Sequence, residues 1–330
     1  MQLSIFPGNA ARRSAPWLRE LLAGAAGTLA FTLALVLPLY AAPPSNPARS
    51  ASHPVPGLNG GRAMVFARAA ASFGPRPSGS PAIEGLRRFI LRELRGNGIP
   101  VEEQRFTART PAGDVPMVNL IARIPGNSGQ RILLTGHYDT KRIQGIQFVG
   151  ANDGGSSTAL LLELATVLSK RKGATGSGPE IWIVFFDGEE AVGDWSETDS
   201  LYGSRHLASQ MEREGRLRSI RALINLDMIG DRDLNLVLEY NSTAALRNLA
   251  VEVAAAQGHP DLFDRHLSAI EDDHIPFAKL NVPVLNLIDF SYGPRHAWWH
   301  SEADTIDKLS PASFGIVGNL VLEIVDRLSR

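Results

Sequence analysis

The stretch Ile181–Glu190, I-W-I-V-F-F-D-G-E-E, decides how the rest of the chain is interpreted. Its six consecutive apolar residues, β-branched or aromatic, predict a strand that is buried on both faces, as in a parallel sheet. In open α/β sheets, functional groups gather where such strands end. We therefore expect one of Glu189 and Glu190 to bind a cation while the other keeps a free carboxylate for proton transfer. The alternative is a pair of glutamates in the first turn of a helix, which the helix dipole also favours.

Composition narrows the classes of protein that the chain can belong to. The 330 residues are 44% hydrophobic and 20% charged, which is typical of a globular enzyme. With a net charge of -1 and a pI near 6.7, nothing predicts a nucleic acid or an anionic membrane surface as partner. Because cysteine is absent, thiol nucleophiles, zinc-thiolate sites and disulfides are excluded, and any metal is left to His, Asp and Glu.

The N-terminal region predicts export. Residues 1–20 carry Arg12, Arg13 and Arg19 and are expected to stay in the cytoplasm, because positive flanks remain inside. Residues 21–42 contain no charge and are predicted to be a signal peptide or a signal anchor; we favour an uncleaved anchor because the apolar run is long. We therefore expect an extracytoplasmic protein, periplasmic or secreted, that touches a membrane only through this segment.

The remaining chain divides into a linker and one domain. Residues 43–62 are rich in Pro, Ser and Gly and predict a flexible linker. From residue 63 to 330, strand and helix patterns alternate, which predicts one three-layer α/β/α domain around a mostly parallel mixed sheet, with an antiparallel pair near its start. The expected strands are 101–107, 117–124, 131–135, 181–186, 220–227, 234–240 and 282–289, and the expected helices are 63–73, 82–97, 156–171, 202–214, 243–257 and 311–328.

Six residues of metal-binding or acid–base type follow predicted strands. A single histidine after a strand is more often a hydrogen-bonded loop residue than a ligand, but a set at the ends of strands in one sheet favours a metal site. Imidazoles and carboxylates are the ligands of an open catalytic zinc site. The spacing excludes a helix-borne H-E-x-x-H motif. The six residues are His137, Asp153, Glu189, Glu190, Asp227 and His300.

Short motifs make the prediction more specific. G-H-Y-D (136–139), A-N-D-G (151–154), F-D-G-E-E (186–190), L-D-M-I-G (226–230) and W-H (299–300) resemble the zinc peptidase family M28, in the same order. Longer strings resemble the animal-type glutaminyl-peptide cyclotransferases of that family: W-S-x-x-D-S-L-Y-G-S-R-H-L-A (195–208), D-D-H-I-P-F (272–277) and V-P-V-L-x-L-I (282–288). The resemblance covers roughly residues 63 to 330 and implies a fold like that of the zinc aminopeptidases.

The resemblance to the cyclotransferases implies a reaction. It implies one zinc ion held by Asp153, Glu190 and His300, and peptide or protein N-termini as substrates. The N-terminal glutamine would be converted to pyroglutamate with release of ammonia. Glu189 would carry a proton from the substrate α-amine to the departing ammonia.

The same resemblance assigns roles around the metal. Asp227 and Asp272 would form a hydrogen-bonded acidic pair in catalysis, which requires that the two share a proton. Trp195, Trp299 and His137 would contact the substrate, with His137 close to the metal but not bound to it. The tryptophans could instead be ordinary core residues, and Asp272 could be a helix cap. Only the complete D-D-H-I-P-F string favours the functional interpretation of Asp272.

Two other classes of function are consistent with the residues. An M28-type metalloaminopeptidase would use Glu189 to activate a metal-bound water. It would hold two zinc ions, bridged by Asp153, on His137, Asp153, Glu190, Asp227 and His300. A binding or receptor ectodomain that lost its chemistry is disfavoured because the ligand set is intact. One departure from the animal cyclotransferases is Gly136, where they carry a cysteine.

Overall fold

The structure is a computed structural model that describes residues 57–172 and 176–330. These residues belong to one unit, His53–Arg330. Its helices are α1 (Gly60–Ala71), α2 (Pro81–Gly96), α3 (Gly155–Lys172), α4 (Tyr202–Arg213), α5 (Ala244–Ala256), α6 (Ile275–Ala278) and α7 (Pro311–Leu328). Its strands are β1 (Val101–Thr110), β2 (Gly113–Ile124), β3 (Arg131–His137), β4 (Glu180–Phe186), β5 (Ile220–Asp227), β6 (Leu236–Glu239), β7 (Phe263–Ser268) and β8 (Val284–Ile288).

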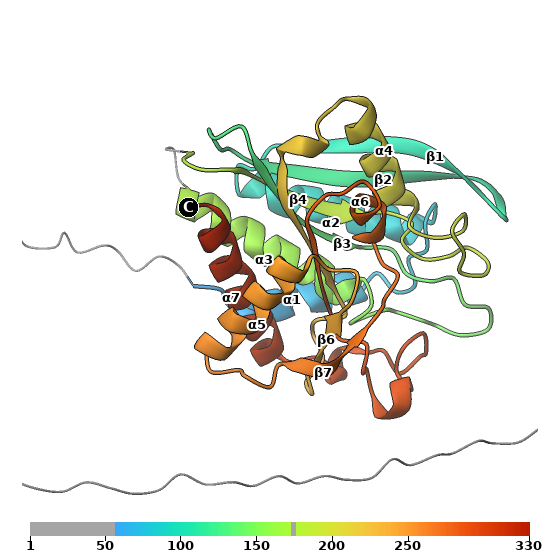
Figure 1. The fold of residues 1–330 in the computed structure, drawn as a ribbon. Helices are drawn as coiled ribbons and strands as arrows, with labels where there is room; N and C mark the ends of the chain where they lie inside the picture. The colour runs from blue at the N-terminus through green and yellow to red at the C-terminus, as the bar shows by residue number, and fades with distance from the viewer. Residues whose placement is uncertain (1–56, 173–175) are drawn as a thin grey trace, which may run out of the picture. The chain divides into compact units, whose positions relative to one another are not determined.

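The main sheet has six strands in the order β1-β2-β4-β3-β5-β8. The four strands β4, β3, β5 and β8 are parallel, while the β1–β2 hairpin joins β4 in antiparallel fashion (Figure 1). β4 lies on one side of β3 and β5 on the other. The connection from β3 to β4 therefore runs in one direction across the sheet, and the connection from β4 to β5 runs back in the other. Such a switch point opens a crevice at the carboxyl ends of the strands.

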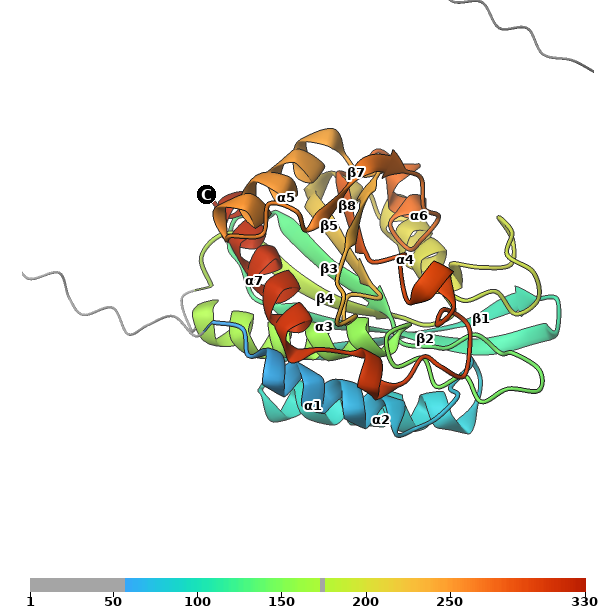
Figure 2. The same ribbon diagram turned by 90° about the horizontal axis from the view of Figure 1, so that it is seen from below.

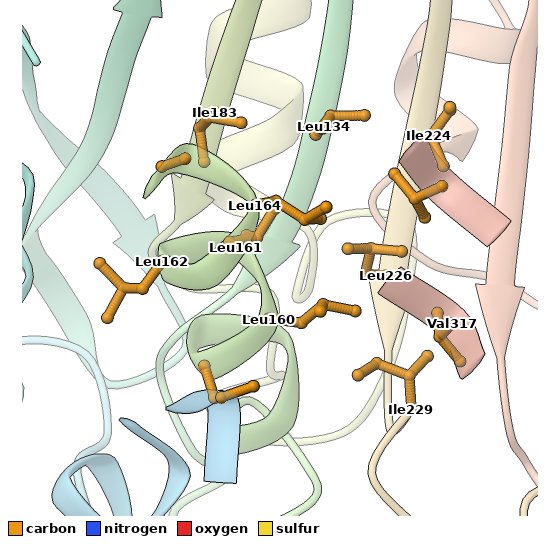
Figure 3. Packing of buried hydrophobic residues seen from close by; sticks show 14 of the residues in the cluster. Leu134, Leu160, Leu161, Leu162, Leu164, Ile183, Ile224, Leu226, Ile229 and Val317 are labelled. Atoms are coloured by element: carbon orange, nitrogen blue, oxygen red, sulfur yellow. The ribbon is translucent and has the colours of Figure 1, made fainter. Parts of the chain in front are cut away.

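Helices cover both faces of this sheet, so the predicted three-layer α/β/α fold with a mostly parallel mixed sheet is confirmed (Figure 2). Alternate residues of each parallel strand point to opposite faces. Leu134 and Ile183 pack with α3 and α7 on one face (Figure 3), whereas Leu133 and Trp182 pack with α4 and α6 on the other. Because both faces are buried, the strands read as continuous apolar runs.

The predicted domain start differs slightly from the structure. Helix α1 begins at Gly60, inside the expected linker 43–62, because Asn59 acts as its N-cap. The side chain of Asn59 accepts the Arg62 N–H at 3.1 Å, and its own N–H donates to Glu163 of α3 at 3.0 Å. The expected cytoplasmic segment 1–20, the signal or anchor segment 21–42 and the linker up to residue 56 lie outside the described residues.

The second sheet contains one strand that the sequence did not predict. This strand is β7, which follows α5 in the chain and pairs in parallel with β6.

None of the helices in residues 57–172 and 176–330 combines the length and the hydrophobicity needed to span a bilayer. Short 3-10 helices, η2 (Leu217–Ser219), η3 (Pro294–His296) and η4 (Ile306–Lys308), complete the fold.

Candidate active site

The two glutamates that follow β4 are placed by a sharp turn. Gly188 has a φ of 74°, and a Cβ on it would lie 2.5 Å from the sulfur of Met117. Only glycine fits this left-handed, crowded position without displacing its neighbour. The carboxylate of Asp139, beyond the end of β3, accepts the N–H groups of Glu189 at 3.2 Å and Glu190 at 3.3 Å. The backbone of both glutamates is therefore fixed at the carboxyl ends of β3 and β4.

Asp153, Glu190 and His300 converge as a group that can hold a metal ion. His300 Nε2 lies 3.3 Å from Asp153 Oδ2 and 3.1 Å from Glu190 Oε1. One ligand atom from each residue lies within 4.8 Å of the others. Asp153 and Glu190 are buried. Two carboxylates and an imidazole in this arrangement fit an open zinc site with one coordination position left for substrate.

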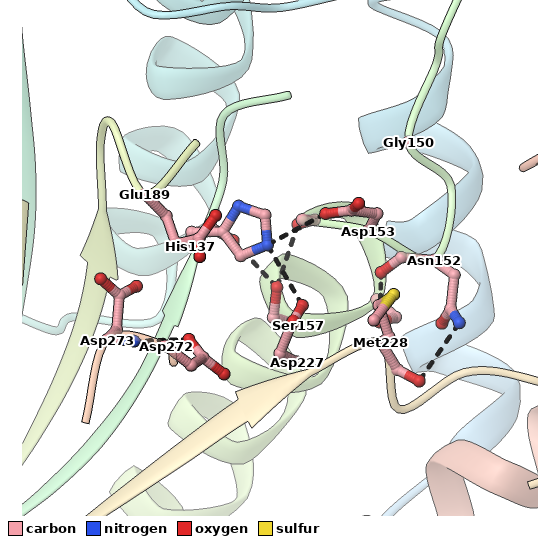
Figure 4. Close-up of polar contacts among 12 residues, drawn as sticks. His137, Gly150, Asn152, Asp153, Ser157, Glu189, Asp227, Met228, Asp272 and Asp273 are labelled. Atoms are coloured by element: carbon pink, nitrogen blue, oxygen red, sulfur yellow. Dashed lines mark hydrogen bonds and ion pairs between the residues drawn. The ribbon is translucent and has the colours of Figure 1, made fainter. Parts of the chain in front are cut away.

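A second group shares Asp153 with the first. His137 Nε2 lies 3.2 Å from Asp153 Oδ1 and 3.1 Å from Asp227 Oδ1 (Figure 4). The geometry therefore contains the constellation that a two-metal hydrolase would need. His137 is buried and does not line the cavity described below, so its position does not support the expected contact with substrate.

Glu189 is buried, and no hydrogen bond joins its carboxylate to another described residue. Burial raises its pKa well above the usual range; His137 opposes the shift, and the charges of Glu190 and Asp272 add to it. Burial also raises the pKa of Asp227 to about 7. The hydrogen bond to His137 lowers this pKa, and the negative charge of Asp272 raises it. Crowded, desolvated carboxylates of this kind are an environment that a divalent cation stabilises.

The acidic pair expected from the sequence is not hydrogen-bonded. Asp272 Oδ2 accepts the side-chain amide of Asn286 at 3.0 Å, and Asp272 Oδ1 accepts the Asp273 N–H at 2.5 Å. Asn225 in turn donates to the Asn286 oxygen at 3.1 Å, so a buried row of amides leads to Asp272. Asp227 and Asp272 are coupled through their charges, and each carboxylate is oriented by other partners.

A cavity of about 450 Å³ opens over the metal-binding group. Trp195 and Trp299, each 38% exposed, form two of its walls. The indole N–H of Trp195 donates to Glu271 Oε2 at 2.9 Å, which joins two loops at the mouth. Trp299 stacks on His300 with ring centroids 4.0 Å apart and meets Phe290 edge-on at 5.1 Å.

Several residues of the cavity were assigned no role from the sequence. Lys141 approaches Glu190 Oε2 at 3.9 Å, and Ile270, Phe290 and Met228 add apolar surface. They belong to loops whose conformation no periodic pattern reports. The G-H-Y-D motif did contain Asp139, and its position two residues after His137 was the available signal for its role behind the glutamates.

Comparisons with known proteins agree with this geometry. The profile of Peptidase family M28 matches residues 119–325. The chain belongs to peptidase family M28. It is 33% identical over 274 residues to a glutaminyl-peptide cyclotransferase of Drosophila melanogaster. The aligned region covers 76% of this chain and 75% of that relative.

Solved structures place this M28 chain beside glutaminyl cyclases. The Acidobacteriales bacterium glutaminyl cyclase matches with a TM-score of 0.80 and 41% identity, covering 86% of this chain and 99% of that one. The Porphyromonas gingivalis glutaminyl cyclase matches with a TM-score of 0.73 and 28% identity, covering 82% and 98%. The resemblance seen in the sequence is thereby confirmed.

The M28 chain has a packing reason for its departure at Gly136. A Cβ on Gly136 would lie 2.7 Å from the carbonyl oxygen of Leu226 and 2.8 Å from Cβ of Ser157. Real Cβ atoms essentially never show contacts below 3.0 Å, so a cysteine would force β3, β5 and α3 apart. Ser157 of α3 and the backbone of β5 occupy the space that a side chain at position 136 would need.

Proposed function

We propose that the chain is an extracytoplasmic zinc-dependent glutaminyl-peptide cyclotransferase, which converts the N-terminal glutamine of peptides or proteins to pyroglutamate and releases ammonia. The observation that carries the proposal is the convergence of Asp153, Glu190 and His300 beside Glu189, whose carboxylate makes no hydrogen bond to another described residue. Similarity to glutaminyl-peptide cyclotransferases supports this reaction over hydrolysis. The location rests on the sequence of residues 21–42.

In this proposal, Asp153, Glu190 and His300 hold a single zinc ion. Zinc at this position would polarise the side-chain amide carbonyl of the N-terminal glutamine. The α-amine nitrogen attacks the amide carbon, a new C–N bond closes the lactam ring, and the bond to the amide nitrogen breaks. Because nucleophile and electrophile belong to one residue, orientation supplies much of the rate, and no water is consumed.

Glu189 is the proton carrier of the proposed reaction. Its carboxylate takes a proton from the α-amine and delivers it to the leaving nitrogen, which departs as ammonia. Burial and the nearby charge of Glu190 raise its pKa, which makes the carboxylate a stronger base. The negative charge of Asp272 acts both on Glu189 and on Asp227. Trp195 and Trp299 narrow the cavity and exclude water from the reacting atoms.

Substrate turnover tests the proposal directly. The full chain is incubated with a glutamine-initiated peptide and, separately, with a leucyl amide, while ammonia and free amine are measured. A cyclotransferase releases ammonia from the first and leaves the second intact. Release of leucine without cyclisation of the peptide would reject the proposal and favour a second candidate, an M28 aminopeptidase. The specific observation in favour of that candidate is the second group, His137, Asp153 and Asp227.

A further inference from the structure

Asp304 lies four residues after His300 and has a completely buried carboxylate. Three successive backbone N–H groups of the segment that carries Asp153 donate to Asp304, one to its main-chain oxygen and two to its carboxylate. The Ala151 N–H reaches the main-chain oxygen of Asp304 at 3.4 Å. Those of Asn152 and Asp153 reach its Oδ1 at 2.8 Å and its Oδ2 at 3.1 Å. Asp304 therefore joins the segment of one expected metal ligand to the segment of another.

We propose that Asp304 is a positioning residue for the metal: it clamps the loop of Asp153 to the loop of His300 and so sets the separation of these two ligands. This inference rests on the proposed zinc site. In the structure, Asp153 Oδ2 and His300 Nε2 lie 3.3 Å apart, although the residues belong to distant parts of the chain. A carboxylate that accepts backbone N–H groups from a ligand's own peptide fixes that ligand before the metal arrives.

The loop of His300 needs such an anchor. His300 itself has a φ of 50°, in the left-handed region that costs a non-glycine residue free energy. Asp304 closes the base of this loop, because the Tyr292 hydroxyl, at the other end, donates to Asp304 Oδ1 at 2.6 Å. The strained backbone of His300 is therefore held between two points that meet at one carboxylate.

The segment of Asp153 is fixed from both sides. Arg76, which is completely buried, donates to the carbonyl oxygens of Gly150 at 2.8 Å and Asp153 at 3.4 Å. The Arg76 guanidinium therefore donates to carbonyl groups of the same segment whose N–H groups donate to Asp304. The side chain of Asn152 extends the connection, because it donates to the main-chain oxygen of Met228, next to Asp227, at 3.2 Å (Figure 4).

Asp304→Asn tests the clamp without changing the shape of the side chain. An amide offers one oxygen and one NH₂ group, so one of the two backbone N–H groups must face a donor. We expect the zinc affinity of the metal-free chain to fall about 10- to 100-fold, the usual cost of losing a partner behind a metal ligand. The affinity is measured by competition with a chromophoric chelator, and circular dichroism checks that each variant is folded.

Asp289→Asn is the matched control. Asp289 is also completely buried, and it accepts the N–H groups of Asn235 and Ser291, each at 2.9 Å. Neither of these residues is an expected ligand. We expect its zinc affinity to stay within about threefold of wild type, well short of the loss expected for Asp304→Asn.

The outcomes separate positioning from general stability. Wild-type zinc affinity in folded Asp304→Asn, or equal losses in both variants, would overturn the inference. If Asp304→Asn does not fold, Asp304→Ser, which leaves space for water beside both N–H groups, is expected to show the same loss. A wild-type chain that binds zinc but releases no ammonia would reject the proposed reaction alone. A wild-type chain that binds no zinc would reject both.

Discussion

His300 Nε2 lies 3.1 Å from Glu190 Oε1, although 110 residues separate the two in the chain. The neighbouring Glu189 has a carboxylate without a hydrogen bond to any described residue. Asp139 holds the N–H groups of both glutamates, so the difference between them lies in the direction of the side chains. Two chemically identical adjacent residues are thereby placed differently, in agreement with the different roles proposed for them, ligand and base.

Substituting each glutamate by glutamine should separate these roles. Glu190→Gln removes a charged ligand, so we expect zinc to be lost on dialysis. Glu189→Gln should keep zinc and lose turnover by about 10²- to 10⁴-fold, the usual contribution of a general acid–base group. Zinc per chain and the rate of ammonia release are measured on the same samples. Substantial residual activity in Glu189→Gln would reject it as the proton carrier.

The convergence of the site could be predicted from the sequence because the carboxyl ends of parallel strands share one edge. His137 and Asp227 end β3 and β5, and Glu190 follows β4, so the apolar runs alone bring these side chains together. Asp153 and His300 were placed in the same set, but long loops separate them from β3 and β8, so the apolar runs alone do not fix their positions. The predicted fold class needed only alternating strand and helix patterns.

The rest of the site depends on tertiary hydrogen bonds that leave no periodic signal. Asp272 was expected to pair with Asp227, but Asn286, on the adjacent strand β8, takes its Oδ2 atom. The strand order, which brings β8 beside β5, decides this, and strand order cannot be read from apolar runs. β7 was missed because its residues D-R-H at 264–266 are polar. Most side chains of β7 are exposed, so the strand has no apolar pattern that would predict it.

Glu271 should control substrate binding through Trp195. Glu271→Ala removes the acceptor of the indole N–H, so the ring is no longer held against the cavity. Since a typical hydrogen bond contributes about 0.5 to 1.5 kcal/mol net, and both partners here are partly exposed to solvent, we expect kcat/KM to fall about 3- to 10-fold, mostly through KM.

Glu271→Gln, which keeps an oxygen acceptor, is the control and should resemble the wild type in steady-state kinetics with a glutamine-initiated peptide. A fall in kcat at constant KM in Glu271→Ala would contradict a role in substrate binding. The emission of Trp195 should shift toward that of exposed indole in the alanine variant only.

Stability should depend on pH through Asp289. Burial raises the pKa of Asp289 to about 7, although the N–H groups of Asn235 and Ser291 oppose the shift. The folded state therefore binds more protons than the unfolded state between about pH 4 and 7. The stabilising effect is complete below the unfolded pKa and is lost as the pH rises through 7, by on the order of 4 kcal/mol at about 1.4 kcal/mol per unit.

The free energy of unfolding, measured in urea from pH 4 to 7.5, checks this dependence. Asp289→Asn cannot titrate at this position, so the difference in unfolding free energy between variant and wild type should change steadily over that range. A constant difference would show that the Asp289 carboxyl keeps its ordinary pKa in the fold.

The number of zinc ions distinguishes the two groups that share Asp153. A cyclotransferase with zinc on Asp153, Glu190 and His300 should bind one ion per chain. His137→Asn should still bind one ion, with an affinity reduced by at most about 10- to 100-fold, because His137 contacts Asp153 from behind. Zinc is counted by elemental analysis after gel filtration. Two ions in the wild type and one in His137→Asn would place a metal on His137 and Asp227 and favour the hydrolase.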